Sequence, residues 1–99
     1  MQAVVDGRIV AQSDDVIECK GYQYFPPGAV RMERLERTAT STECPFKGSA
    51  HYFTLRLEER VLNDAVWTYE EPYDEHRDLK GRLAFYHDKY RDIHVEAQG

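Results

Sequence analysis

Residues 40–48 read Thr-Ser-Thr-Glu-Cys-Pro-Phe-Lys-Gly and gather a thiol, an amine and hydroxyls in a short segment. Pro45 pushes the backbone of Cys44 towards an extended conformation and pre-sets a turn that Gly48 can finish with a positive φ. In such a turn the two amides after the proline point back at the sulfur. These amides and the Lys47 ammonium would lower the thiol pKa and create a reactive thiolate. The segment is therefore the best candidate site in the chain.

The same residues also have ordinary structural uses. A free cysteine is most often a small buried apolar side chain, and a lysine is most often a solvated surface charge. Trp67 and Tyr69 share one face of a predicted strand, where they can floor a pocket for a flat ligand, although core packing is the commoner use of such rings. Contact of Cys44 and Lys47 with a ligand is therefore a stronger expectation than catalysis by Cys44.

Three other chemistries lack the residues that they need. Zinc requires three or four ligands at short spacings, and the chain has no Cys-x-x-Cys or His-x-x-x-His, so we expect no metal and no cofactor. Nucleotidyl transfer needs carboxylates that hold Mg²⁺, and no Asp-x-Asp follows Gly48-Ser49. A serine hydrolase is unsupported because no Gly-x-Ser-x-Gly elbow is present.

Composition and charge restrict the class of protein and its partners. The 99 residues, 41% hydrophobic and 31% charged, suit one soluble globular domain spanning residues 1–99. The formal charge of -5 disfavours binding to nucleic acid, and no apolar run approaches the roughly 20 residues of a membrane span. The N-terminus lacks the features of a signal peptide. We therefore expect a cytoplasmic protein whose two cysteines, Cys19 and Cys44, are reduced thiols.

The elements that must position the candidate site are mostly short β-strands. Turn residues at frequent intervals predict a mainly β, antiparallel two-sheet domain with one or two short helices. Asp6-Gly7 and Lys20-Gly21 predict the first two hairpin turns. One helical turn or an irregular crossing is expected over residues 29–35, and residues 74–81 predict a short helix capped by Asp74.

Two longer strands are predicted beside the site. The first runs from Ala50 to Leu57, with a clearly apolar face made of His51, Phe53, Leu55 and Leu57. The second covers residues 61–69, with one face made of Val61, Asn63, Ala65, Trp67 and Tyr69. A turn at Glu58-Glu59 joins the two strands, and residues 40–48 are expected as a loop that enters the first. Residues 83–87 and 90–95 predict a closing hairpin around Asp88-Lys89.

Several short motifs follow one another along the chain in an order that resembles a known protein family. They are Tyr24-Phe25-Pro26, Val30-Arg31, Leu35, Thr42, Cys44-Pro45-Phe46-Lys47-Gly48, Ala50, Tyr52, Asp64-Ala65-Val66-Trp67, Tyr69, Pro72, Gly81 and Ala84-Phe85-Tyr86. Over about residues 4–95 this order resembles the domain of unknown function 427 family. The resemblance implies a small, mostly β bacterial domain, related to the β-tent arrangement of two sheets. It also brings a nucleotidyltransferase label without an established activity, and it adds Tyr24, Arg31 and Tyr52 to the expected ligand wall.

Three functions remain open at this point. The leading one is a binding module whose concave sheet face presents Cys44, Lys47, Trp67 and Tyr69 to a small molecule or a protein partner. The second is a thiol enzyme that uses Cys44, with Lys47 and Tyr69 as electrostatic and proton-donating helpers. The third is a structural domain that forms a homodimer through an edge strand near residues 90–95. A monomer and a homodimer are both compatible with the sequence.

Overall fold

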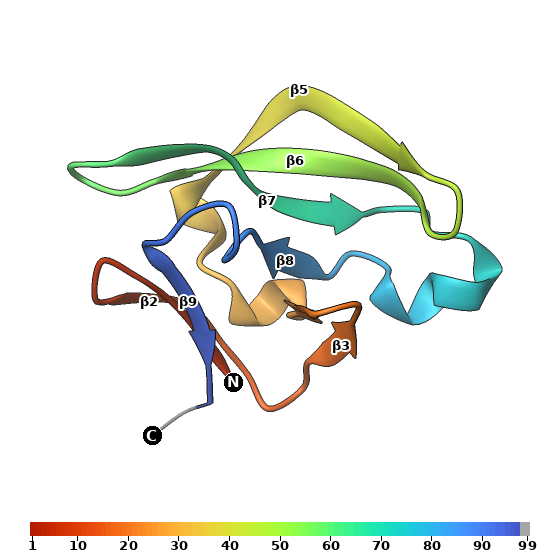
Figure 1. Ribbon diagram of the computed structural model, residues 1–99, viewed down its shortest axis with the longest axis horizontal. Coiled ribbons are helices and arrows are strands. Elements are labelled where there is room, and N and C mark those ends of the chain that lie inside the picture. Colours follow the sequence, from red (N-terminus) through yellow and green to blue (C-terminus); the bar gives the residue numbers. More distant parts are fainter. Residues whose placement is uncertain (98–99) are drawn as a thin grey trace.

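The computed structural model describes residues 1–97 and is built from antiparallel β-sheets (Figure 1). Its strands are β1 (Gln2–Val5), β2 (Arg8–Gln12), β3 (Ile17–Cys19), β4 (Tyr22–Tyr24), β5 (Leu35–Cys44), β6 (Gly48–Arg56), β7 (Val61–Tyr69), β8 (Leu83–Phe85) and β9 (Ile93–Glu96). Its 3-10 helices are η1 (Pro27–Ala29), η2 (Met32–Arg34) and η3 (Asp74–Leu79). No helix among the described residues has the length and apolar character needed to cross a bilayer. The predicted mainly β class is confirmed.

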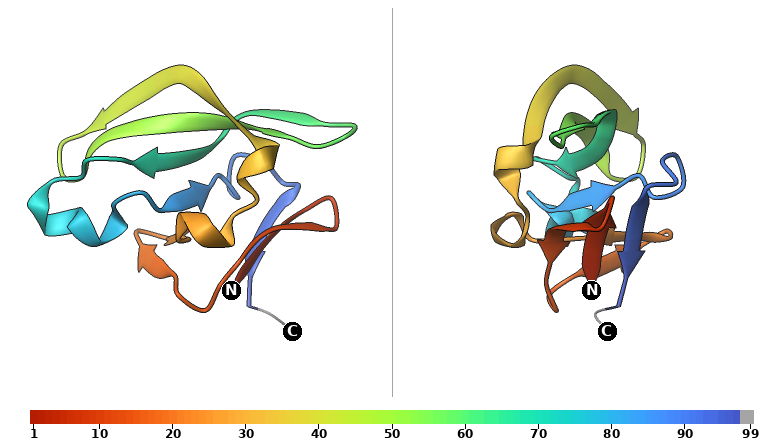
Figure 2. Two further views of the ribbon diagram at one scale, coloured as in Figure 1. Left: turned by 180° about the vertical axis from the view of Figure 1, so that it is seen from behind. Right: turned by 90° about the vertical axis from the view of Figure 1, so that its left-hand side faces the viewer.

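The sheets form two layers. One layer is the sheet β2-β1-β9, and the other is the sheet β5-β6-β7-β8. The β3-β4 hairpin extends the second layer, because a bridge between Phe25 and Leu83 joins the end of β4 to β8. Figure 2 shows how strongly this long sheet curls, with β5 arching over β6. β9 lies at the edge of its sheet, where the homodimer alternative needs a strand, and that alternative stays a prediction.

The first two hairpin turns are those that the sequence predicts. Asp6 and Gly7 have φ values of 51° and 77°, and Lys20 and Gly21 have values of 51° and 87°. Both central residues of each turn therefore adopt the left-handed region that a two-residue turn of this type requires. The Lys20-Gly21 turn matters for the site, because it sets Cys19 opposite Tyr22.

The central strands bury both of their faces. Val66 and Phe85, paired across β7 and β8, belong to a main core, whereas their neighbours Trp67 and Ala84 belong to a second cluster on the opposite face. The main core contains Ala3, Val5, Val10, Ala11, Phe25, Val30, Leu55, Leu57, Leu62, Ala65, Val66, Leu83, Phe85 and Ile93. We call the second set the aromatic cluster; its buried members are Tyr24, Ala50, Tyr52, Trp67, Tyr69, Leu79 and Ala84.

The prediction for the two long strands is partly wrong for both, because His51, predicted on the apolar face of β6, lies outside the core, 3.6 Å from the Glu70 carboxylate. Phe53, Leu55 and Leu57 contact the main core as expected, but the other face of β6 is buried as well. In β7 the register shifts at residues 63–65, where Asp64 has a φ of 51°. The shift exposes Val61 and buries Leu62 and Ala65 in the main core, so only Trp67 and Tyr69 share the predicted face.

Three other expectations are corrected. Residues 40–44, expected as part of a loop, belong to the strand β5, and no apolar alternation reveals this strand because it lies at an edge and buries neither face. Residues 83–85 and 93–96 do not pair with each other, since β8 joins β7 and β9 joins β1. Asp74 is the first residue of η3, and the capping position is occupied by Tyr73 without a side-chain hydrogen bond.

Candidate functional site

The aromatic cluster surrounds the indole of Trp67. Its ring centroid lies 4.7 Å from that of Tyr22 and 4.4 Å from that of Tyr86. Tyr24 and Tyr52 pack further out, with centroid distances of 6.3 Å and 6.5 Å. Ring pairs at these separations add stabilisation beyond the area that they bury. The curled sheet therefore wraps a tightly packed set of rings, and Trp67 and its neighbours are a floor rather than an open pocket.

Three tyrosines in and around the cluster, Tyr24, Tyr69 and Tyr86, have raised pKa values. Burial raises the pKa of Tyr24 to about 12, although the hydrogen bond from Trp67 Nε1 to its hydroxyl, at 3.4 Å, opposes the rise. Burial, and then the hydrogen bond with Tyr52, raise the pKa of Tyr86 to about 12. Burial also raises the pKa of Tyr69 well above its usual value. These hydroxyls can donate hydrogen bonds, but they are poor acids.

The Cys44–Gly48 segment forms the turn between β5 and β6, and we call it the thiol turn. Cys44 pairs with Gly48 at the base of the turn. Gly48 has a φ of 114°, and a Cβ placed there would lie 3.2 Å from the carbonyl oxygen of Glu71. The Lys47 carbonyl accepts a hydrogen bond of 2.9 Å from the amide of Tyr73. The turn is therefore held against residues 71–73, and a glycine is required at its end.

The electrostatics of Cys44 agree with the prediction made from the turn residues. Partial burial raises the pKa of the thiol, but hydrogen bonds from the backbone amides of Phe46 and Lys47 lower it. The ammonium groups of Lys47 and Lys20 lower it further, and the net result is a pKa below the usual value. Cys44 is half-buried and not in a disulfide. It therefore combines access with an environment that favours the thiolate.

Lys47 is buried, contrary to the usual behaviour of a lysine. Only 6% of the residue is exposed, and Nζ lies 6.0 Å from the centroid of the Tyr69 ring. Within residues 1–97, no carboxylate lies within ion-pair distance of this ammonium. The next residue back, Phe46, points outwards with 60% of its surface exposed, and Lys20 Nζ lies 4.9 Å from its ring centroid. The thiol turn thus places a cation inwards and an aromatic ring outwards.

Comparison with protein-family models tests the family resemblance that the sequence motifs indicate. The model described as "Domain of unknown function (DUF427)" matches residues 1–96. The chain belongs to the DUF427 family. Comparison with the curated proteins gives no match.

The nucleotidyltransferase label of this family can be tested on the DUF427 fold itself. Such chemistry needs a cluster of carboxylates that holds Mg²⁺ against the triphosphate. In the described part of the chain, no group of three His, Cys, Asp or Glu side chains is placed to hold a metal ion. Residues 1–97 therefore provide no three-ligand metal site that would support this label.

Six of the seven predicted site residues come together in the DUF427 fold. They are Tyr24, Cys44, Lys47, Tyr52, Trp67 and Tyr69. Arg31 lies elsewhere: its Nε donates to the carbonyl of Ile9 at 3.1 Å, and its Nη1 lies 3.7 Å from Glu33. Arg31 therefore belongs to the family motif, but it lies away from the other six residues in the structure.

Sequence reasoning missed four residues around the cluster. Cys19, Tyr22 and Tyr86 pack against it, and Lys20 reaches the thiol turn. A signal for the first two was present, because the Lys20-Gly21 turn pairs Cys19 with Tyr22 and the period of two then sets Tyr22 on the same face as Tyr24. Tyr86 follows β8 and had no comparable signal.

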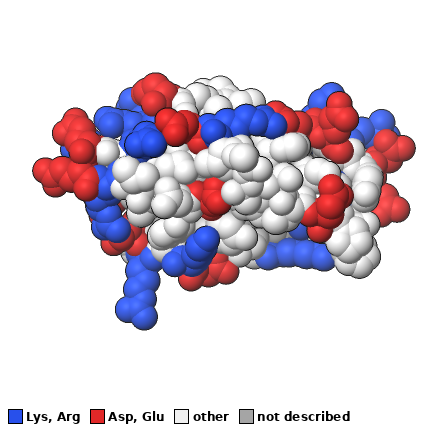
Figure 3. Space-filling model, turned by 90° about the horizontal axis from the view of Figure 1, so that it is seen from above, with Lys and Arg blue, Asp and Glu red and all other residues white. Residues whose placement is uncertain are grey.

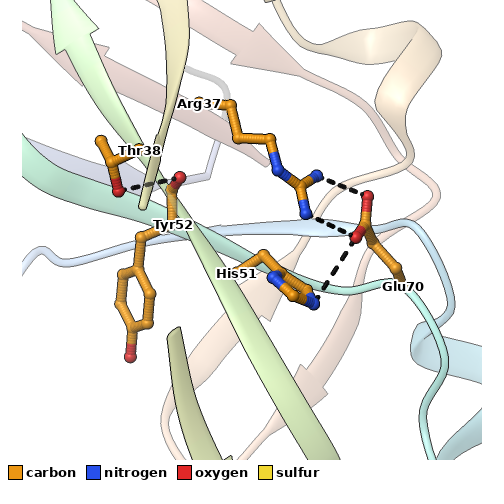
Figure 4. Close-up of polar contacts among 5 residues, drawn as sticks. All are labelled: Arg37, Thr38, His51, Tyr52 and Glu70. Carbon is orange, nitrogen blue, oxygen red and sulfur yellow. Dashed lines mark hydrogen bonds and ion pairs between the residues drawn. The ribbon is translucent and has the colours of Figure 1, made fainter. Parts of the chain in front are cut away.

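A separate polar group occupies the opposite face of β6. Figure 4 shows Arg37 bound to Glu70 through two hydrogen bonds, of 2.7 Å and 2.9 Å, with His51 Nε2 at 3.6 Å from the same carboxylate. The rings of His51 and Tyr52 leave β6 in different directions, so this group is separated from the aromatic cluster. The hydrogen bond from Arg37, and to a lesser extent its charge, hold the pKa of Glu70 below the usual value.

The face above β5 and β6 carries charges of both signs. Acidic and basic side chains are interspersed around its rim, and its middle is mostly uncharged (Figure 3). The ion pairs between Arg37 and Glu70 and between Arg56 and Glu36 contribute to this mixture. A mixed surface of this kind differs from the one-sign stripe by which proteins follow a phosphate backbone.

Proposed function

We propose that this DUF427 domain binds a small, flat, anionic molecule at the thiol turn, above the aromatic cluster. The observation that carries the proposal is Lys47 itself: only 6% of the residue is exposed, and no carboxylate of residues 1–97 lies within ion-pair distance of its ammonium. Holding a cation among buried residues without a counter-charge opposes folding, and an apolar side chain of similar length would avoid that cost. An anionic ligand supplies the missing counter-charge.

The surroundings of Lys47 indicate the shape of the ligand. Trp67 and Tyr69 are buried and can form only the floor of the site. The surfaces left for contact are the exposed ring of Phe46 and the half-buried rings of Tyr22 and Tyr86. Aromatic faces favour a planar partner, and the cation favours a carboxylate or a similar group.

Intrinsic fluorescence gives a direct test, because Trp67 is the only tryptophan of the chain. We expect titration with benzoate to change the emission of Trp67 with saturation, and the neutral analogue benzamide to have a much weaker effect. Lys47→Met removes the charge and should weaken benzoate binding by about tenfold or more, which corresponds to one good charged hydrogen bond.

The matched control is Lys80→Met, which removes the same charge from an exposed lysine. This variant should bind benzoate like the unmodified protein. Emission that does not respond to benzoate, or equal binding by the Lys47→Met variant, would contradict the proposal.

A second function, thiol-dependent chemistry at Cys44, is favoured by one observation. The amides of Phe46 and Lys47 and the charges of Lys47 and Lys20 lower the pKa of a half-buried thiol. In this function the Cys44 thiolate adds to the carbonyl carbon of a bound molecule, the C=O π electrons move onto the oxygen, and Lys47 holds the negative charge that forms there. Labelling of the native protein with iodoacetamide distinguishes the two functions, since an inert Cys44 leaves only the binding function.

A further inference from the structure

A groove lies along the outer edge of β2, away from the thiol turn. It has a volume of about 470 Å³, and its lining comprises Gly7, Arg8, Ile9, Val10, Arg31, Arg34 and Leu57. None of these residues belongs to the thiol turn or to the aromatic cluster. We call it the arginine groove, after the three arginines that line it.

The fold builds one wall of the groove from the segment that crosses between β4 and β5. A bridge joins Ala11 to Val30, and the amide of Arg31 donates to the carbonyl of Val10 at 2.9 Å. β2 therefore lies beside the residues that join η1 to η2. The side chain of Arg31 then crosses the strand edge, where its Nε donates to the carbonyl of Ile9 at 3.1 Å. Two hydrogen bonds thus hold Arg31 in place.

The positive charges of the groove are only weakly compensated. Arg8 lies 3.4 Å from Glu58 and Arg31 lies 3.7 Å from Glu33, and both pairs are exposed to solvent. Exposed pairs of this length contribute little, so an incoming anion can displace either carboxylate. Arg34 is half-buried, and no carboxylate of residues 1–97 lies within ion-pair distance of it.

The floor between these charges is apolar. Val10 and Leu57 are buried beneath the groove, and Ile9 is 41% exposed. A second hollow of about 310 Å³ continues the groove and shares Ile9, Val10 and Arg31 with it. Concave, partly apolar sites with a few convergent charges are typical of small-molecule binding.

We infer that the arginine groove binds a small organic anion whose carboxylate or phosphate head contacts Arg8, Arg31 and Arg34 and whose apolar body lies on Ile9. A guanidinium binds such heads with two parallel hydrogen bonds, so that three of them favour an oxyanion strongly. The chain as a whole carries a charge of -5, which opposes a long polyanion and favours a single charged head.

Isothermal titration calorimetry of the whole chain tests the inference with four probes: hexanoate, hexyl phosphate, inorganic phosphate and neutral hexanol. We expect saturable binding of hexanoate or hexyl phosphate, and the tighter of the two identifies the head. Inorganic phosphate and hexanol should each bind at least about tenfold more weakly, because each lacks one of the two contacts. Added salt should weaken the binding.

Variants locate the binding. Arg34→Gln should weaken it by about tenfold or more, Arg34→Lys by less, and Arg8→Gln should also weaken it. The control is Arg77→Gln, an exposed arginine in η3 that does not line the groove. The emission of Trp67 should not change, which separates this site from the thiol turn. Equal binding by the Arg34→Gln and Arg77→Gln variants, or no saturable binding of either hexyl probe, would overturn the inference.

Discussion

The main core and the aromatic cluster lie on opposite faces of the same strands. They differ in the residue types that compose them and in how completely their polar groups find partners within the chain. The main core is apolar throughout and receives side chains from both layers, including Val5 and Ile93 from the β2-β1-β9 sheet. The aromatic cluster is made largely of rings with polar atoms, and its rim carries two thiols, at Cys19 and Cys44. A buried lysine, Lys47, adjoins it.

This difference assigns different roles to the two regions of the DUF427 fold. An apolar core with few polar atoms needs no partner outside the chain. A cluster bordered by a thiol with a lowered pKa and by an ammonium without a carboxylate contains groups that packing alone does not require. We therefore assign most of the stability to the main core and the proposed binding function to the cluster.

The largest expected effect is the loss of a ring from the main core. Phe85→Ala should lower the free energy of unfolding by about 3–5 kcal/mol, because it removes a fully buried ring and leaves a cavity. Phe46→Ala, in the exposed tip of the thiol turn, should change it by less than about 0.5 kcal/mol. Urea unfolding measures both. Similar losses in the two variants would remove the contrast between the regions.

An intermediate effect is expected at the end of the thiol turn. Gly48→Ala should lower the free energy of unfolding by about 1–3 kcal/mol, because alanine is strained at a φ of 114° and its Cβ approaches the Glu71 carbonyl. Gly28→Ala is the control, since a Cβ at that position meets no atom within 4 Å. If the two variants unfold at the same urea concentration, the turn is not held as tightly as described.

A smaller effect of opposite sign is expected at Thr68, between the two site residues of β7. Its hydroxyl oxygen is buried without a hydrogen-bond partner in the described chain. Thr68→Val keeps the shape and removes the orphan hydroxyl, so the free energy of unfolding should rise by up to about 1 kcal/mol. Thermal unfolding gives the comparison with the unmodified protein. A clear loss of stability would show that the hydroxyl has a partner.

The sequence predicted the local chemistry of the fold well. Asp6-Gly7 identified one turn because Asp and Gly both tolerate positive φ values, and Lys20-Gly21 identified a second through its glycine, although Lys is a poorer first turn residue. Cys44-Pro45 and Gly48 identified the thiol turn and the amides that act on the sulfur. These features depend on neighbouring residues, so no knowledge of the tertiary structure was needed. The β-tent relationship and the bacterial origin implied by the family resemblance stay predictions.

Features that depend on contacts between residues far apart in the sequence could not be predicted from the sequence. β5 has no apolar face, and its pairing with β6 alone makes it a strand. The irregular stretch at Asp64 shifts the face of β7, and no residue type requires such a shift. Burial of Lys47 follows from the packing of the turn on Tyr73, far along the chain. For the same reason, the family motif predicts Arg31 beside residues from which the fold separates it.

The most direct test of the central claim is the rate of alkylation of Cys44 by iodoacetamide as a function of pH, in native protein carrying Cys19→Ser. The account predicts a midpoint below that of an ordinary cysteine, about 8.5. Lys47→Met should move the midpoint upwards, because it removes a positive charge beside the sulfur. A Cys44 that reacts only after denaturation, or a midpoint that is unchanged in the Lys47→Met variant, would contradict the claim that the amides and cations of the thiol turn activate an accessible Cys44.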